Sequence, residues 1–140
     1  MGDMTINTSA IAHVRLTVTN IVRSRKFYDD VFGWPIAIEL PDDADEATRD
    51  QLSFLFGGCI YNIGHCLIGL RPVADDTFDE NRVGLDHLAF KLATKDELDS
   101  AVAHLDDLGI AHEPVKHIGI AYIVEFREPD NIALELSAPK

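Results

Sequence analysis

The chain has 140 residues, of which 46% are hydrophobic, and its 24 acidic and 12 basic residues give a formal net charge of −12. This length suits one compact domain, or two small halves packed together, around a hydrophobic core. The acidic excess, with no cluster of Lys and Arg to offset it, argues against a nucleic-acid partner or an anionic membrane surface. We therefore expect a small-molecule substrate or a protein partner.

The N-terminal sequence carries no basic start followed by an apolar run, and no stretch approaches the roughly 18 apolar residues of a spanning helix. We expect a cytoplasmic protein. In a reducing compartment, Cys59 and Cys66 are expected to be buried free thiols.

The first elements of the chain are a strand and a helix. Residues 11–19 alternate between apolar and polar side chains, which is typical of a half-buried strand. Asn20 can cap a helix over residues 21–32, and Gly33 is a stop signal. Residues 34–40 then predict a second strand.

The rest of the first half combines an acidic segment with two apolar runs. Residues 41–50 are expected to form a solvated insertion, whose position makes a mobile lid possible. The runs at 51–56 and 65–70 predict two more strands, separated by Gly57, Gly58 and the stretch from Tyr61 to Gly64. The first half is therefore expected to be strand, helix, three strands.

The second half repeats this order, because DHLAFKLAT matches AHVRLTVTN at a shift of 74 residues. The stretch from Thr94 to Glu97 is a capping box that begins a helix, which Gly109 ends. Strands are predicted near 112–117, 119–127 and 131–137. We expect an α+β fold with two βαβββ modules, whose curled mixed sheets have helices outside and a cavity inside. The single domain, 1–140, divides into a first module, a connector and a second module, at 11–72, 73–84 and 85–138.

Three polar residues lie on the non-apolar faces of the predicted strands. His13 and His87 are equivalent positions on the first strands, on the face opposite the apolar one. Glu135 lies in PDNIALEL on the strand face opposite Leu134 and Leu136. If these side chains meet on one concave surface, two imidazoles and one carboxylate form a set that binds iron, zinc, nickel or manganese.

The strand-initial His13 followed by TVTNIVRSRKFYDDVFGW, then GLDHLAF and EFREPDNIALEL, resembles the vicinal oxygen chelate superfamily. This superfamily includes glyoxalase I, extradiol dioxygenases, fosfomycin and bleomycin resistance proteins, and methylmalonyl-CoA epimerase. The resemblance covers about residues 11–137. It implies the fold given above but leaves the reaction open, since the superfamily spans several reaction types and metal-free binders.

The resemblance also implies metal ligands at the first-strand histidine of each module and at a carboxylate on each fourth strand. His13, His87 and Glu135 match three of these positions, whereas Gly69 occupies the fourth and offers no ligand. His65 is the only nearby residue that can substitute. The set therefore resembles the two-histidine, one-glutamate arrangement of the extradiol dioxygenases, with one divalent metal per site.

Other polar residues are candidates for supporting roles. Arg15, Arg71 and Lys91 share the expected ligand faces and are candidates for binding an anionic substrate group; the alternative is that they extend to the rim. His117 and Tyr122 are candidate catalytic residues, by resemblance to the proton-transfer residues of extradiol enzymes. The alternative for this pair is packing or cavity lining.

Two functions remain open at this point. The first is a metal-dependent isomerase, lyase or ring-cleaving dioxygenase that binds an oxygenated organic substrate. The second is a metal-free protein that sequesters a small molecule, like the bleomycin resistance proteins, which the net charge of −12 suits. A homodimer is expected in either case, because curled sheets of this size leave edges to cover.

Overall fold

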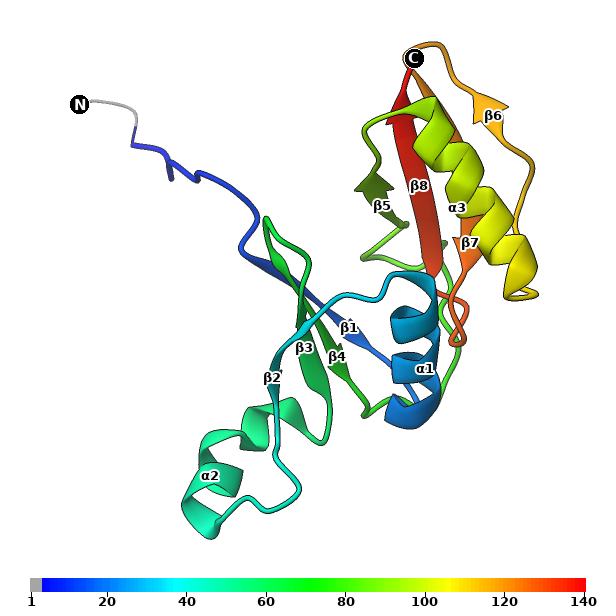
Figure 1. Ribbon diagram of the computed structural model, residues 1–140. Coiled ribbons are helices and arrows are strands. Elements are labelled where there is room, and N and C mark those ends of the chain that lie inside the picture. Colours follow the sequence, from blue (N-terminus) through cyan, green and yellow to red (C-terminus); the bar gives the residue numbers. More distant parts are fainter. Residues whose placement is uncertain (1–3) are drawn as a thin grey trace. The chain divides into compact units, whose positions relative to one another are not determined.

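A computed structural model describes residues 4–140, which form two compact units. The first unit contains the described residues up to Ile21 together with Trp34–Ala74, and the second contains Val22–Gly33 and Asp75–Lys140. The fold class is α+β, with one four-stranded mixed sheet in each unit (Figure 1). No helix among residues 4–140 is both long and apolar enough to cross a membrane.

The sheet of the first unit has the strand order β1-β4-β3-β2. Strands β1 and β4 are parallel, and the other two pairs are antiparallel. The face carrying Leu16, Ile68 and Leu70 is buried. The elements of this unit are β1 (His13–Thr17), β2 (Ile36–Glu39), α2 (Glu46–Gln51), the 3-10 helix η1 (Ser53–Leu55), β3 (Cys59–Asn62) and β4 (Leu67–Arg71).

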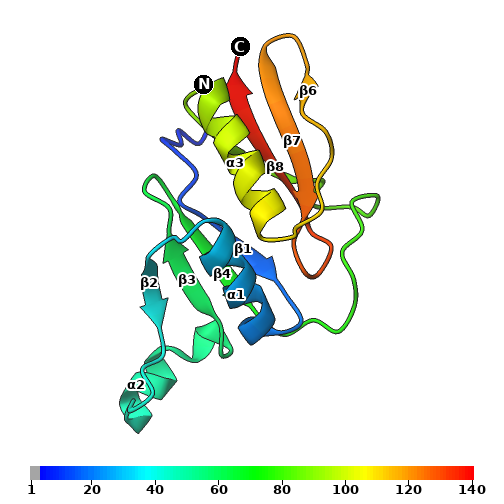
Figure 2. The same ribbon diagram turned by 45° about the vertical axis from the view of Figure 1, so that its right-hand side comes forward.

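The sheet of the second unit repeats this topology with the order β5-β8-β7-β6, in which β5 and β8 are parallel. Helix α3 lies along β7 and β8 and buries Leu98 and Leu105 (Figures 1 and 2). The elements of this unit are α1 (Ile21–Val31), β5 (Leu88–Lys91), α3 (Lys95–Asp107), β6 (Lys116–His117), β7 (Ala121–Arg127) and β8 (Ala133–Pro139).

Helix α1 packs on the second sheet, although it follows β1 in the chain. The ring centroid of Phe32 lies 4.9 Å from that of Phe90 and 6.5 Å from that of Phe126. The Arg23 guanidinium forms a 2.8 Å ion pair with Asp130, whose side chain is 6% exposed. Aromatic contacts thus make α1 part of the second unit's core.

The structure confirms the predicted repeat and the two predicted helices. Helix α1 spans most of the predicted 21–32, and Gly33 has a φ of +64°. The Thr94 hydroxyl caps α3 by accepting a hydrogen bond from the Glu97 backbone N–H, and the Glu97 carboxylate accepts one from the backbone N–H of Ala93. Cys59 is buried and Cys66 half-buried, both as free thiols.

The acidic segment 41–50 is largely exposed, as expected of a solvated insertion, but the strand predicted over 51–56 is wrong. The acidic segment contains α2, because the Asp45 carboxylate accepts the Thr48 backbone N–H and so caps a helix. The apolar run 51–56 forms the end of α2 and then η1, whereas β3 begins at Cys59. A short apolar run is compatible with a buried helix end as well as with a strand. Here the Asp45 cap favours the helix.

A buried carboxyl group organises the turn between β7 and β8. The Glu128 side chain is 3% exposed, and its Oε1 accepts hydrogen bonds from the backbone N–H groups of Asp130 and Ile132. Its Oε2 is buried and has no hydrogen-bond partner. Asn131 completes the turn with a φ of +69°, a conformation that Asn tolerates. Burial raises the pKa of Glu128 to about 7, with a further contribution from the Asp130 charge.

Replacing Glu128 by Gln should change the pH dependence of stability. An acid whose pKa is raised on folding stabilises the native state while it is protonated, and this contribution is lost as the pH rises from about 4.5 to about 7. The Glu128→Gln variant should therefore be more stable than the wild type at pH 8, by on the order of 1–3 kcal/mol, and similar at pH 5. Denaturant unfolding at both pH values measures this difference.

The matched control is Glu46→Gln, at an exposed position in the first turn of α2. This variant should have the same pH dependence of unfolding free energy as the wild type. Identical pH profiles for the wild type and Glu128→Gln would contradict the raised pKa.

Candidate functional site

The pairing of three strands places two carboxylates opposite each other in the second sheet. Glu135 of β8 is paired directly with Ala89 of β5 and with Glu125 of β7. Directly paired residues point to the same face, so both carboxylates lie on the face opposite Leu134 and Leu136. His87 precedes β5 and lies two residues before Ala89, on this same face.

His87 and Glu135 are in contact. The distance from His87 Nε2 to Glu135 Oε2 is 3.3 Å, with the imidazole 44% exposed and the Glu135 side chain 12% exposed. On its other side, His87 Nδ1 lies 2.7 Å from a carboxylate oxygen of Asp86. The Asp86 hydrogen bond, and then the Glu135 charge, raise the pKa of His87, against the opposing effect of partial burial.

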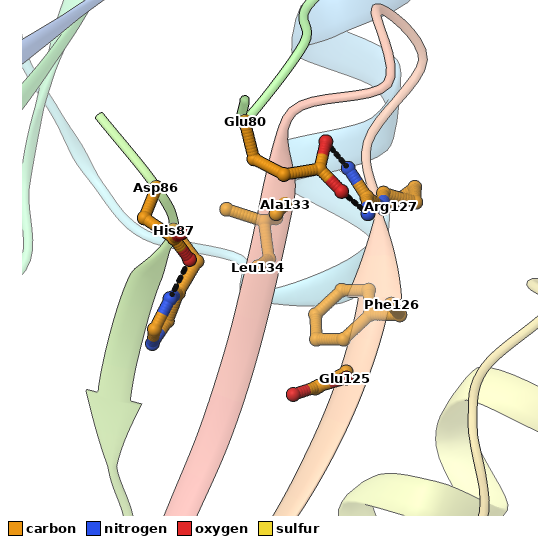
Figure 3. A pocket seen from close by; sticks show the side chains of 8 residues that line it. All are labelled: Glu80, Asp86, His87, Glu125, Phe126, Arg127, Ala133 and Leu134. Carbon is orange, nitrogen blue, oxygen red and sulfur yellow. Dashed lines mark hydrogen bonds and ion pairs between the residues drawn. The ribbon is translucent and has the colours of Figure 1, made fainter. Parts of the chain in front are cut away.

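A cavity of about 170 Å³ opens beside His87 (Figure 3). Asp86 and His87 lie at the start of β5, Glu125 and Arg127 come from β7, and Glu80 comes from the segment before β5. The Arg127 guanidinium binds both carboxylate oxygens of Glu80, at 2.7 and 3.1 Å, and lowers the pKa of Glu80 to about 2. The cavity therefore has one neutralised ion pair and two further carboxylates, those of Asp86 and Glu125, around the imidazole of His87.

The His87–Glu135 pair fits two ligands of one metal ion. Bonds of about 2.1 Å at angles of about 90–110° place two ligand atoms about 3.0–3.4 Å apart, and the observed separation is 3.3 Å. A carboxylate on the far ring nitrogen is the usual support for a metal-binding histidine. The described part of the chain contains no group of three or more His, Cys, Asp or Glu side chains placed to hold a metal.

The third predicted ligand, His13, lies exposed at the start of β1 in the first unit. The registers of the two sheets correspond closely: Arg15, two residues after His13, is paired with Gly69, just as Ala89, two residues after His87, is paired with Glu135. Gly69 is thus the counterpart of Glu135. His65 is exposed in the turn between β3 and β4, outside the strands.

The candidate substrate-binding cations have different environments. The Arg15 guanidinium donates to the Phe54 carbonyl and lies 5.8 Å from the centre of the Phe54 ring. Arg71 lies over the ring of Phe56 at 4.4 Å. Lys91 is exposed and paired with Ser137, on the same face as Glu135. The two arginines therefore hold the segment after α2 against the first sheet.

The catalytic candidates His117 and Tyr122 lie on the other face of the second sheet. Tyr122 is three residues before Glu125 on β7, so the two side chains point to opposite faces. The His117 and Tyr122 rings stack with centroids 4.9 Å apart, and Lys95 Nζ at the start of α3 lies 5.1 Å from the Tyr122 ring centre. The structure thus separates this pair from Glu135.

Sequence reasoning missed Asp86, Glu125 and Phe54. Asp86 had a signal, since it directly precedes His87 in GLDHLAF. The alternation of side chains in AYIVEFR places Glu125 on the polar face of its strand. Its position opposite Glu135, however, depends on the length of the turn between β7 and β8. Phe54 lay in the run that was predicted to be a strand, so it carried no signal.

The Asp86→Asn variant should lower the pKa of the His87 imidazole, because it replaces a charged hydrogen-bond acceptor by a neutral one. Glu135→Gln should lower it less, since Glu135 acts through its charge alone. Proton NMR titration of the metal-free protein measures both effects. His112, which has its own carboxylate partner in Asp106, is an internal reference that should not move. An unchanged His87 pKa in Asp86→Asn would contradict the hydrogen bond.

Comparison with known proteins identifies the family to which the chain belongs. A model of the Glyoxalase/Bleomycin resistance protein/Dioxygenase superfamily matches residues 10–136. A glyoxylase/bleomycin resistance protein/dioxygenase domain from Frankia sp. EAN1pec is 28% identical, with a TM-score of 0.75, covering 96% of this chain and 94% of that one.

Two more distant structures share the fold. A lactoylglutathione lyase from Agrobacterium tumefaciens is 21% identical, with a TM-score of 0.69 and 94% of each chain covered. A mutant of the fosfomycin resistance protein FosX from Listeria monocytogenes, in complex with Mn(II) and 1S,2S-dihydroxypropylphosphonic acid, is 18% identical. Its TM-score is 0.75, covering 96% of this chain and 95% of that one. The chain therefore belongs to the Glyoxalase/Bleomycin resistance protein/Dioxygenase superfamily, which is the vicinal oxygen chelate superfamily.

Proposed function

We propose that this protein is a small metal-dependent enzyme of the glyoxalase and dioxygenase type. It binds one divalent metal per site through His13, His87 and Glu135, and an oxygenated organic substrate at that metal. The observation that carries the proposal is the 3.3 Å contact between His87 Nε2 and the largely buried Glu135 carboxylate. A nearly buried carboxylate requires a cationic or hydrogen-bonding partner, and this one faces an imidazole.

The charges around Glu135 also favour a cation. Glu125 is paired directly opposite Glu135, an arrangement of like charges that destabilises a sheet. The nearest positive group to Glu125 is Lys116, whose Nζ is 3.9 Å from a Glu125 carboxylate oxygen. A divalent ion at Glu135 relieves this repulsion more fully than a protonated His87 does, because it carries twice the charge.

The residues of the chain have distinct roles in this proposal. Asp86 fixes the His87 ring so that Nε2 faces Glu135. The Glu80–Arg127 pair closes one wall of the cavity without adding net charge. When bound, the metal would supply a Lewis acid that stabilises negative charge developing on substrate oxygens.

The ligand set narrows the metal and the reaction only in part. Two histidines and one carboxylate suit iron(II), and zinc, nickel or manganese also accept them. The FosX structure carries Mn(II), and another neighbour is a lactoylglutathione lyase. We propose that the reaction is an isomerisation, a lyase reaction or an extradiol-type ring cleavage. A screen of catechols, 2-oxoaldehydes and hydroxy acids with the metal-loaded protein separates these classes.

The second candidate function is a metal-free protein that sequesters a small molecule, which the resemblance to bleomycin resistance proteins implies. A cavity of about 260 Å³ in the first unit supports it. However, Arg15 lines that cavity, which opposes a cationic drug despite the net charge of −12. Metal content discriminates between the two functions.

Elemental analysis tests the leading proposal. Protein purified without chelator should contain about one equivalent of iron, zinc, nickel or manganese per chain. Alanine substitutions at His13, His87 or Glu135 should remove the metal and weaken Co²⁺ binding, measured by calorimetric titration, at least 100-fold, because each removes one of three protein ligands.

The matched controls are His65→Ala and His117→Ala, which remove imidazoles from outside the proposed ligand set. Both should keep the metal. Absence of metal from the wild type, together with an unchanged Co²⁺ affinity in Glu135→Ala, would contradict the proposal and favour the metal-free function.

We also propose a homodimer. Strands β1 and β5 are edge strands of their sheets; β1 begins at His13, and β5 begins directly after His87. Light scattering should give twice the mass of the chain. Mixing unfolded His13→Ala and Glu135→Ala chains and refolding them tests how a site is assembled. If His13 comes from the second copy, heterodimers regain one intact site, or about a quarter of all sites. If His13 comes from the same chain, the mixture binds no metal.

A further inference from the structure

A second cavity lies on the first sheet, on the face that carries His13. Its volume is about 260 Å³, larger than the cavity beside His87. Apart from one imidazole and one guanidinium, its walls are apolar. It is lined by His13, Arg15, Phe54, Ile60, Leu67 and Gly69.

Gly69 keeps the floor of this cavity open. A Cβ atom at this position would lie 3.1 Å from Arg15 Cγ and 3.6 Å from Ile60 Cγ1, so a side chain here would enter the space between those two residues. The equivalent position in the second sheet is the carboxylate of Glu135. The position that carries a proposed metal ligand in the second module therefore borders an open cavity in the first module.

Phe54 supplies an aromatic wall. It is 43% exposed, although it is a large apolar residue, and it is held in place through its neighbours. The Arg15 guanidinium binds the Phe54 carbonyl and lies over its ring, and Arg71 lies over the ring of Phe56. An exposed ring fixed beside an open cavity is suited to stacking against another flat ring.

Arg15 gives the cavity a positive charge. No carboxylate among residues 4–140 forms an ion pair with it, although the chain carries a net charge of −12. Its guanidinium has five N–H donors, and its hydrogen bond in the structure is to the Phe54 carbonyl. The remaining donors are available to an acidic group on a ligand.

We propose that this cavity binds an aromatic anion, with the ring between Phe54 and Gly69 and the acidic group at Arg15. The size fits, since an apolar cavity of about 150 Å³ holds benzene and this one is larger. His13 lines the same cavity, so a ligand here lies next to a proposed metal ligand. Only the identification of this ligand as the substrate rests on the proposed function.

The test uses 2-naphthoate and its uncharged analogue 2-naphthamide, titrated into the protein in the presence of EDTA. The wild type should bind one 2-naphthoate per chain, at least tenfold more tightly than 2-naphthamide. Gly69→Leu fills the floor and should weaken binding of both compounds at least tenfold. Thr17→Leu is the matched control: Thr17 is an exposed residue on the same face of β1, outside the cavity lining. It should leave both affinities within about twofold of the wild type.

Two further variants separate the ring from the charge. Arg15→Met should bring 2-naphthoate down to the affinity of 2-naphthamide, and Phe54→Ala should weaken both compounds about tenfold. Circular dichroism reports whether Gly69→Leu is folded. No binding of 2-naphthoate by the wild type, or an unchanged affinity in folded Gly69→Leu, overturns the proposal. If Gly69→Leu does not fold, unchanged affinities in Arg15→Met and Phe54→Ala overturn it.

The naphthoate titrations test the cavity separately from the proposed metal site. All these titrations lack metal, and Co²⁺ titration of Phe54→Ala should match the wild type, because Phe54 is not a proposed ligand. If the wild type binds Co²⁺ but does not bind 2-naphthoate, only the aromatic-anion proposal is refuted. Naphthoate binding without any metal site refutes only the metalloenzyme.

Discussion

The parallel pairing of the first and last strand of each module is the constraint on which the site depends. Pairing β5 with β8 sets Ala89 opposite Glu135 and so brings His87 within 3.3 Å of a carboxylate 48 positions further along the chain. A shift of one residue in this register would turn Glu135 into the core and Leu134 or Leu136 out of it. The apolar residues of β8 therefore fix the face on which Glu135 lies, because a one-residue slip would expose them.

This constraint explains which parts of the molecule were predictable from sequence. His13, His87 and Glu135 stood out because alternation and a repeat of 74 residues both refer to the strands that the core holds in register. The correspondence of Gly69 with Glu135 came from laying HCLIGLRP over NIALELSAP, and the observed strand pairing agrees with it. Helix α3 was equally accessible, since the Thr94 cap and Gly109 mark its ends locally.

The segment between β2 and β3 was not predictable in the same way. It has no counterpart in the second module, so the repeat gave no guidance, and its apolar residues Phe54 and Leu55 fitted a strand. Its actual shape depends on the Asp45 cap and on Gly58, where a Cβ atom would lie 1.8 Å from the Leu70 carbonyl oxygen. Such a close backbone approach is a tertiary property. The packing of α1 on the second sheet, through Phe27 and Phe32, is likewise invisible to local pattern.

The two modules share a topology, but their polar faces carry different side chains. The difference centres on one paired position, which is Gly69 in the first sheet and Glu135 in the second. In the second sheet this position is Glu135, opposite Glu125 and close to Asp86 and His87, so the face concentrates negative charge and favours a cation. In the first sheet it is Gly69, beside Arg15 and Ile60, so the face offers apolar space and a single positive charge. The two sheets thus provide equivalent frames, and the residues at and beside this position give the two faces opposite charge.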